Sequence, residues 1–344
     1  MNNQELSFLV IGAGAVGGIT AALLKKNGYD VEIVCKHEEY ASLVQNSGIE
    51  LEGICGSFKV AMPAYVSVSQ VTGKKDFILH ATKATDMAEA ARQAAGLLKE
   101  DGYMVSMQNG ICEDELGEIV GIGRIIGCVT GWGATMKRPG KLIMTSTGDF
   151  IIGYPGRAPD NNLLKLADAL SSVVPVRTTG NIMGHLYSKL IINSCITSLG
   201  AICGLYLGDM LSRRKIRRIF IEIIREAVAV ADRMNLNIEV FGGRLNFRKF
   251  LRGHTVFDHL RRHLLILIIG FKYRRLKSSS LQSLERGKPT EIDYLNGYIV
   301  RNGEKTGVPT PMNQMIVTMI HEIELKKRPI TLKNFDDPVF DRFN

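Results

Sequence analysis

The 344-residue sequence lacks the marks of several protein classes. Its six cysteines form no C-x-x-C pair and lie mostly in apolar runs, as is typical of reduced thiols rather than of a disulfide framework or a zinc site. The N-terminus has no basic region followed by a cleavage site, so we expect no signal peptide. No internal repeat or low-complexity tract is present. These absences predict a cytoplasmic globular protein, long enough for two domains.

Acidic residues are nearly missing from one segment. Between Arg244 and Lys277 there are ten Lys or Arg residues and one acid, Asp258, so this segment carries the whole net charge of +9. None of the motifs of nucleic-acid-binding modules is present, and we expect no nucleic-acid partner. The segment surrounds an apolar stretch, residues 264–269, which we interpret as a local core too short to span a bilayer. Its three histidines have no acids or thiols clustered around them, so we expect no metal site.

A glycine-rich turn follows the first apolar run of the chain. Residues 6–11 are predicted as a strand, Gly12-Ala13-Gly14-Ala15-Val16-Gly17 follows directly, and a helical pattern then continues to Gly28. In a strand–turn–helix of this kind the first glycine allows the tight turn. The second lets backbone N–H groups approach a pyrophosphate, and the third lets the helix pack on the strand. The order predicts a dinucleotide-binding Rossmann domain.

The second predicted strand, residues 31–35, ends in Lys36 and His37. An NAD-specific site presents an acid here to the ribose 2′-hydroxyl, whereas a cation suits the 2′-phosphate of NADP. We therefore predict NADPH as the cofactor. Glu38 and Glu39 follow directly. The alternative is that one of them turns toward the ribose and favours NADH.

Two further strand-like runs end in polar residues. Residues 77–80 lead to Lys83, and residues 103–107 lead to Asn109. Ligands of an open α/β sheet bind beyond the carboxyl ends of its strands, so Lys83 and Asn109 are candidates for contact with cofactor and substrate. Later strand-like runs are expected to extend the same sheet, at residues 125–129, 141–145, 150–152 and 174–177.

After Gly180 the pattern becomes helical, and we predict a Rossmann domain at 1–180 and an all-α domain at 181–344. The first helix, residues 186–208, consists mostly of apolar or small residues, among which stand Lys189, its single charged side chain, Asn193 and Thr197. These three fall at i, i+4 and i+8 and form one polar stripe, which suits a helix that faces a cavity. A membrane span and a lysine that merely reaches water are the alternatives.

Two other helices are predicted in this domain. Residues 213–234 have an apolar face opposite a charged one that includes Arg217, which we interpret as solvated. A helix from Pro289 to about Lys305 is expected to begin with a capping box of Thr290 and Asp293.

Four motifs, in this order, resemble the ketopantoate reductase (2-dehydropantoate 2-reductase) family. After the glycine fingerprint come ATK at 81–83 with QNG at 108–110, KLIINSCITSL at 189–199, and SSSLQSLERGKPTEIDYLNG at 278–297. The resemblance implies a Rossmann domain joined to a helical domain, and reduction of ketopantoate by NADPH. The family helix usually has a second asparagine where this chain has Thr197, and a tryptophan where it has Tyr187. These differences leave the identity of the 2-oxo acid open.

The resemblance also implies site roles. Lys189 matches the catalytic lysine and general acid, and Glu291 matches the acid of the T-E-I-D motif. The cofactor is expected at residues 12–17, Lys36, Lys83 and Asn109, and the substrate at Asn109, Asn193, Thr197 and Ser279.

We thus expect a soluble, cytoplasmic NADP-dependent oxidoreductase of pantothenate and coenzyme A biosynthesis that acts on a small 2-oxo acid, without nucleic acid or stable membrane insertion. A homodimer is compatible with the sequence. The alternatives are a paralogue that reduces another 2-oxo acid, and a protein that binds NADPH without turnover.

Overall fold

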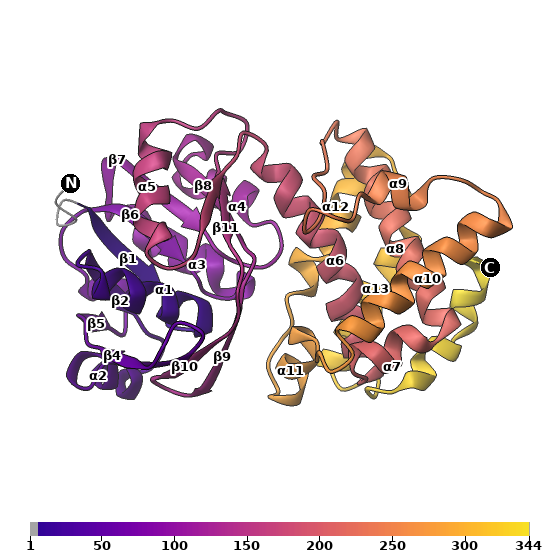
Figure 1. Ribbon diagram of the computed structural model, residues 1–344, viewed down its shortest axis with the longest axis horizontal. Coiled ribbons are helices and arrows are strands. Elements are labelled where there is room, and N and C mark those ends of the chain that lie inside the picture. The colour runs from indigo at the N-terminus through magenta and orange to yellow at the C-terminus, as the bar shows by residue number, and fades with distance from the viewer. Residues whose placement is uncertain (1–5, 344) are drawn as a thin grey trace. The chain divides into compact units, whose positions relative to one another are not determined.

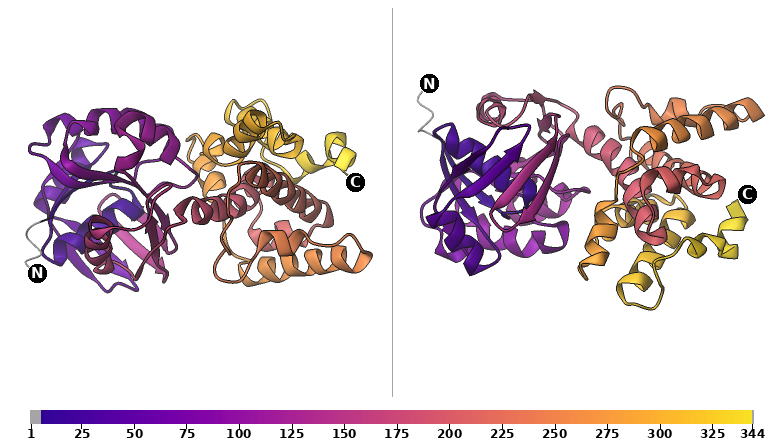
Figure 2. Two further views of the ribbon diagram at one scale, coloured as in Figure 1. Left: turned by 90° about the horizontal axis from the view of Figure 1, so that it is seen from above. Right: turned by 60° about the horizontal axis from the view of Figure 1, so that its bottom comes forward.

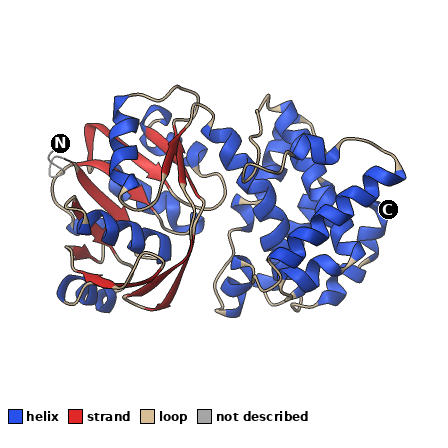
Figure 3. Ribbon diagram, in the orientation of Figure 1, coloured by secondary structure: helices blue, strands red, loops and turns tan. Residues whose placement is uncertain are grey.

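The computed structural model describes residues 6–343, and contacts divide the chain into two compact units (Figure 1). One unit comprises the described part of Met1–Gln108 together with Cys112–Leu186, and the other comprises Asn109–Ile111 and Tyr187–Asn344. Every described strand lies in the first unit, whereas the second is built from helices (Figure 3). The predicted α/β fold, a Rossmann-type region followed by a helical region, is confirmed.

The first unit is organised around an eight-stranded sheet of order β12-β11-β8-β7-β6-β1-β2-β5. All neighbours are parallel except β11 and β8. The chain runs outward from β1 to β2, then returns past β1 to β6, so the order reverses between β1 and β6. Ligands of such sheets bind at that switch point. The strands are β1 (Ser7–Ile11), β2 (Asp30–Val34), β5 (Ala64–Tyr65), β6 (Lys75–His80), β7 (Leu98–Ser106), β8 (Ile125–Thr130), β11 (Phe150–Gly153) and β12 (Val176–Thr178).

A second, four-stranded sheet of order β4-β3-β10-β9 accompanies the first. The run at 141–145 was predicted to extend the main sheet, and this prediction is wrong, because β10 forms a hairpin with β9 and pairs with β3 instead. Strands β3, β4 and β9 were not predicted. β3 and β4 are short and alternate with charged residues, and β9 begins with small residues and ends in Lys137 and Arg138. The strands are β3 (Ile49–Gly53), β4 (Phe58–Val60), β9 (Gly133–Arg138) and β10 (Lys141–Ser146).

Helices cover the sheets of the first unit, and the innermost strands are fully buried. Phe8, Val10, Ile33 and Leu79 have no exposed surface. The helices are α1 (Ala15–Lys26), α2 (Glu38–Asn46), α3 (Met87–Ala95), α4 (Glu113–Val120) and α5 (Asn161–Ser171), with 3₁₀ turns η2 (Val68–Gln70), η3 (Ala84–Asp86) and η4 (Ile122–Arg124).

The helical unit is built around α6 (Ile182–Cys203), of which only the first turn belongs to the first unit. This is the one described helix long and apolar enough to cross a membrane, but 83% of its most apolar window is buried. It packs as a core helix. It ends before the predicted Gly208 because Gly204, at φ +73°, takes the left-handed conformation that terminates helices.

The other helices of this unit are α7 (Leu207–Ser212), α8 (Arg214–Arg233), α9 (Phe247–Leu251), α10 (Val256–Lys272), α11 (Ser279–Glu285), α12 (Asn296–Thr306) and α13 (Pro311–Glu324), with 3₁₀ turns η5 (Ile292–Tyr294), η6 (Leu332–Asp336) and η7 (Pro338–Phe343). Among them, α8, α12 and the turn before α11 contact α6, whereas α9 packs on α8 and α10 packs on α7 and α8 (Figure 1).

Two sequence predictions fail in this unit. Arg217 of α8 was expected in water, but it is 8% exposed because its guanidinium donates to the carbonyls of Leu211 and Ser212 at the end of α7. The stretch at 264–269 was expected to be a local core. Most of it faces solvent, and Ile266 alone of these residues is buried.

Candidate functional site

The glycine turn joins β1 to α1 at the switch point of the large sheet, and its glycines meet different constraints. Gly12 has φ +105°, and a Cβ there would lie 2.7 Å from the backbone of Ala81, just beyond β6. A Cβ on Gly17 would lie 2.2 Å from the carbonyl oxygen of Gly12. Neither position accepts a side chain. A Cβ on Gly14 would have no neighbour within 4 Å, so Gly14 keeps an open space clear.

That open space lies at the N-terminus of α1. Gly14 is the N-cap residue, and no described side chain caps the helix. The first amide groups of α1 and the positive end of its dipole are thus directed at a position where a pyrophosphate can bind. These residues fit a dinucleotide. The predicted strand, turn and helix are all confirmed here.

Lys36, predicted to meet a 2′-phosphate, lies directly after β2 and is exposed. Its Nζ is 3.1 Å from Oδ2 of Asp86 in η3, after β6. Both side chains are well solvated, so this ion pair contributes little stability, about 0–1 kcal/mol. An incoming phosphate can therefore compete with Asp86 for the lysine. Glu38 and Glu39 are exposed in the first turn of α2.

Lys83 is half-buried and forms the N-cap of η3, at the carboxyl end of β6. Beneath it lies a buried polar cluster that sequence reasoning missed. Nδ1 of His80 is 2.6 Å from Nε2 of Gln108, whose Oε1 accepts a hydrogen bond from Ser106. Burial lowers the pKa of His80 to about 4, so its ring is neutral and Nδ1 accepts a hydrogen bond from the side-chain amide of Gln108. This cluster ties the end of β6 to the end of β7.

The turn that follows β7 carries Asn109, and Asn109–Ile111 makes its contacts with the helical unit. Gly110 has φ +90°, and a Cβ there would lie 2.5 Å from the carbonyl oxygen of Tyr294. The structure thus places Asn109 close to the segment that carries Glu291.

Lys189, Asn193 and Thr197 do lie on one helix, α6, at the predicted spacing. Lys189 and Asn193 are half-buried, whereas Thr197 is 8% exposed. The hydroxyl of Thr197 donates to the carbonyl oxygen of Asn193 over 2.7 Å. Its proton is therefore used within the helix, and its oxygen can only accept from a ligand. Tyr187 is fully buried and donates to the carbonyl of Ala227 in α8, so it anchors α6.

Ser279 lies at the start of α11 and is exposed. The preceding residue, Ser278, caps this helix by accepting a hydrogen bond from the amide of Leu281. A Cβ on Gly200 of α6 would lie 2.9 Å from Cβ of Ser278. The serine turn thus packs directly on α6, one turn beyond Thr197.

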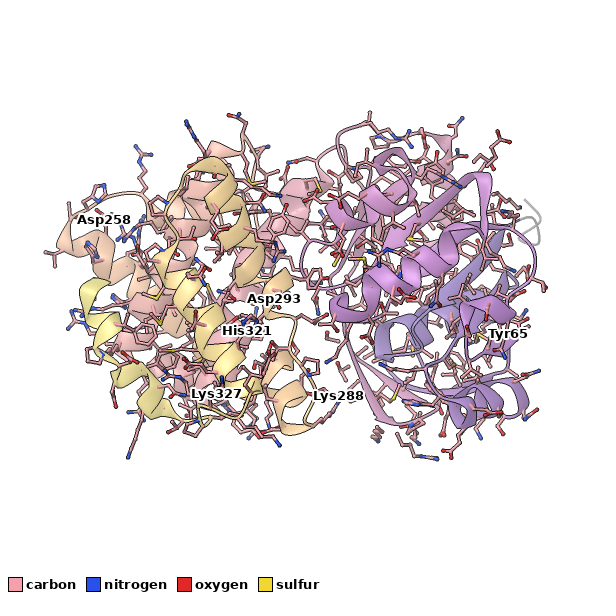
Figure 4. The ribbon with its side chains drawn as sticks, turned by 180° about the vertical axis from the view of Figure 1, so that it is seen from behind. Tyr65, Asp258, Lys288, Asp293, His321 and Lys327 are labelled. Atoms are coloured by element: carbon pink, nitrogen blue, oxygen red, sulfur yellow. The ribbon has the colours of Figure 1, made fainter. Side chains whose placement is uncertain are left out.

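Glu291 is half-buried and directly precedes η5. The single helix predicted over 289–305 is divided into η5 and α12, because Leu295 leaves helical geometry at φ −108°, ψ −101°. The predicted capping box is also wrong. Thr290 accepts from the amide of Ile292, while Asp293 lies 3.2 Å from His321 of α13 (Figure 4).

A chain of buried hydrogen bonds connects α6 to three other helices, and the sequence analysis did not identify it. Ser198 of α6 donates to Asn296 over 2.5 Å, Asn296 donates to Asn313 over 2.9 Å, and Asn313 donates to Glu226 of α8 over 2.6 Å. Glu226 also accepts from the amides of Met312 and Asn313 at the start of α13. The only sequence signal is a polar residue on an otherwise apolar helix face.

The described residues contain no group of three or more His, Cys, Asp or Glu side chains that could hold a metal ion. His263, one of the histidines of the basic segment, instead accepts a hydrogen bond from Arg217.

Two family models match the chain. The model described as "Ketopantoate reductase PanE/ApbA" matches residues 8–157, and "Ketopantoate reductase PanE/ApbA C terminal" matches residues 181–324. A 2-dehydropantoate 2-reductase of Aquifex aeolicus is 28% identical, with 93% of this chain and 97% of the relative covered. The enzyme of the same name from Pyrococcus abyssi is 27% identical, with 92% and 97% covered.

Solved structures agree with these matches. A PanE/ApbA family ketopantoate reductase from Ralstonia eutropha superposes with a TM-score of 0.79 at 27% identity, covering 93% of this chain and 99% of the other. D-mandelate dehydrogenase with NADH and anilino(oxo)acetate superposes with a TM-score of 0.78 at 24% identity, covering 93% and 98%, and shares the fold. The glycine turn at the sheet's switch point, the helical second unit and both family models lead to one conclusion: the chain belongs to the PanE/ApbA ketopantoate reductase family of oxidoreductases.

Proposed function

We propose that this protein reduces ketopantoate (2-dehydropantoate) to pantoate with NADPH, in the cytoplasm, as a step of pantothenate and coenzyme A biosynthesis. The observation that carries the proposal is the polar stripe of α6. Lys189 and Asn193 lie half-buried on a core helix, in the same unit as the Asn109 turn and Glu291. A cation and two amides held this way suit a substrate that has both a ketone and a carboxylate.

NADPH, when bound, would supply the hydride that the keto carbon of the substrate accepts, and the side chains of the protein would bind and polarise the substrate. Negative charge develops on the carbonyl oxygen, and the Lys189 ammonium stabilises that charge and donates the proton that completes the hydroxyl. Glu291 holds the ammonium in place as its counter-charge. Asn109, Asn193 and Ser279 bind the polar groups of the substrate, and Thr197 offers one acceptor oxygen.

The glycine turn, Lys36 and Lys83 bind the cofactor in the proposal. Gly12–Gly17 and the N-terminus of α1 receive the pyrophosphate, and Lys36 exchanges its pairing with Asp86 for the 2′-phosphate. NADH lacks this 2′-phosphate and so has no group for Lys36 to pair with. We therefore expect Lys36→Ala to raise KM for NADPH by about tenfold and to leave KM for NADH unchanged. Equal effects on both cofactors would refute this role.

Turnover tests the catalytic proposal. We expect purified protein to oxidise NADPH on addition of ketopantoate, and Lys189→Ala to lose at least a hundredfold in kcat, as expected for a general acid that also stabilises charge. NADPH binding should be unchanged. Lys305→Ala, an exposed lysine of α12, is the matched control and should retain full activity. Unchanged turnover in Lys189→Ala would contradict the assignment.

A second candidate is reduction of another 2-oxo acid by the same groups. The hydrogen bond of the Thr197 hydroxyl to its own helix favours it, because the site then lacks one donor that an asparagine would provide. A panel of 2-oxo acids, assayed beside ketopantoate with NADPH and NADH, distinguishes the two.

A further inference from the structure

The outward face of α10 is apolar over the whole length of the helix. Figure 2 shows α10 (orange) along the edge of the helical unit in both views. Phe257 is 74% exposed, Leu264 55% and Phe271 73%. The inner face is firmly packed, since a Cβ on Gly270 would lie 2.9 Å from Leu211, and Arg262 is buried and donates to the carbonyls of Phe250 and Leu251. The exposed face therefore belongs to an ordered helix.

The exposed surface is large enough for a stable interface. From their exposed fractions, the apolar side chains of α10 leave on the order of 800 Å² in contact with water, about the area that each partner buries in a standard protein–protein interface. Apolar patches on monomeric proteins are usually smaller, roughly 300–600 Å². The side chains are Val256, Phe257, Leu260, Leu264, Leu265, Leu267, Ile268 and Phe271.

The sequence of this face is symmetric about Leu264. Phe257 and Phe271 lie seven residues before and after it, and Leu260 and Ile268 lie four residues before and after it. A two-fold axis through Leu264 would therefore place each aromatic side chain opposite an aromatic one of the second copy, and each aliphatic side chain opposite an aliphatic one. An interface between identical chains requires such self-complementarity. These side chains are spaced by three, four, four and three residues, so they lie along one side of the helix.

Charge selects the antiparallel arrangement. Asp258 lies in the first turn of α10, Lys272 is its last residue, and Arg274 and Arg275 follow just after its end. Antiparallel helices bring the acid and the positive end of one helix dipole to the cations and the negative end of the other. A parallel pair would place the cations of both chains side by side. Figure 4 shows Asp258 near one extremity of the helical unit, where a second chain can reach it.

We propose that α10 forms the two-fold interface of a homodimer, packing antiparallel against α10 of a second copy with Leu264 at the axis. A hollow of about 520 Å³ lined by residues 271–276 lies at the C-terminal end of the face. The second copy's Phe257 fills it in this arrangement. The proposal concerns assembly, and it is independent of the identity of the substrate.

Sedimentation velocity of the full chain over a range of concentrations tests the dimer. Wild type should be dimeric at micromolar concentration, and Leu264→Glu should be monomeric with an unchanged circular dichroism spectrum, because two like charges meet at the axis. The matched control is Leu164→Glu, since Leu164 of α5 is 52% exposed and lies outside the interface. It should remain dimeric. A dimeric Leu264→Glu protein would refute the proposal.

Cysteine crosslinking tests the orientation. Leu264→Cys should form a disulfide-linked dimer under oxidation, and so should the double variant Phe257→Cys/Phe271→Cys. Phe257→Cys alone should not, because its two copies lie about 20 Å apart along antiparallel helices at 1.5 Å per residue. Wild type controls for the native cysteines. Crosslinking of Phe257→Cys alone would overturn the antiparallel arrangement.

The apolar face with basic flanks could instead bind an anionic membrane surface. Wild type and Leu264→Glu are therefore also sedimented with phosphatidylcholine vesicles that contain phosphatidylglycerol. We expect neither protein to sediment with them. A wild-type monomer that binds these vesicles, and a Leu264→Glu variant that does not, would overturn the dimer in favour of a membrane contact.

Discussion

Glu226 offers a sharp prediction about the stability of the helical unit. Its carboxylate is 6% exposed and accepts three hydrogen bonds, from the amide of Met312 at 2.7 Å, the amide of Asn313 at 2.9 Å and the side chain of Asn313 at 2.6 Å. Glu226→Ala leaves three buried donors without this acceptor. An unsatisfied buried donor costs about 1–3 kcal/mol, so we expect a loss of roughly 3–5 kcal/mol.

Glu226→Gln should cost less, for a reason that the network provides. The three hydrogen bonds of the chain run in one direction, each donor lying on the Ser198 side and each acceptor on the Glu226 side. With glutamine in place of the carboxylate, the side-chain carboxamides of both asparagines can rotate by 180°, which reverses the direction of every hydrogen bond in the chain. The backbone N–H of Asn313 would then be the one donor left without an acceptor. We expect a loss of about 1–2 kcal/mol.

Urea unfolding followed by far-ultraviolet circular dichroism measures these losses. The midpoints can be compared directly where the variants share the same m-value, the slope of the free energy of unfolding against urea concentration. Glu222→Ala is the matched control, because Glu222 lies one turn earlier on α8 and pairs with the half-exposed Arg225. It should change stability by less than about 1 kcal/mol. A Glu226→Ala midpoint equal to that of Glu222→Ala would refute the reasoning, and so would a glutamine variant less stable than the alanine variant.

Two further predictions concern the nucleotide-binding unit. Burial raises the pKa of Glu113 to about 7, from about 4.5. Because its folded-state pKa is the higher one, the unfolded chain ionises first, and Glu113 should reduce the free energy of unfolding by up to about 3 kcal/mol as pH rises from 4.5 to 7. Glu113→Gln should remove this component from the pH profile of urea midpoints, and an unchanged profile would count against the buried carboxyl. Gly14→Ala should keep the thermal midpoint of wild type but weaken NADPH binding measured by nucleotide fluorescence, because its Cβ enters only open space, whereas Gly12→Ala should lower the midpoint itself. Normal NADPH affinity in folded Gly14→Ala would contradict the placement of the pyrophosphate.

Much of the fold could be predicted because long apolar runs and glycine turns are local signals. The strand before Gly12, the helix after it and the stripe of Lys189, Asn193 and Thr197 all depend on residues close together in sequence. The four-stranded sheet could not be predicted, because β3 and β10 are parallel partners that lie about ninety residues apart and because β3 alternates with charged side chains.

The failures at Arg217 and α10 have a common physical cause. Sequence pattern assigns a side chain to a face, but tertiary packing decides what covers that face. Arg217 is on the charged side of α8, yet two carbonyls at the end of α7 draw it inside. Residues 264–269 are apolar, yet α10 packs through Arg262, Ile266 and Gly270 and leaves the longer apolar side in water. The Glu226 network was invisible for the same reason, since its members come from four helices.

One measurement tests the central claim most directly: the rate of NADPH oxidation by the purified protein with ketopantoate, for wild type and Lys189→Ala. We predict turnover by wild type, loss of at least a hundredfold in kcat for Lys189→Ala with NADPH affinity retained, and full activity in Lys305→Ala. NADPH binding without turnover of ketopantoate or any other 2-oxo acid by wild type would contradict the proposed function.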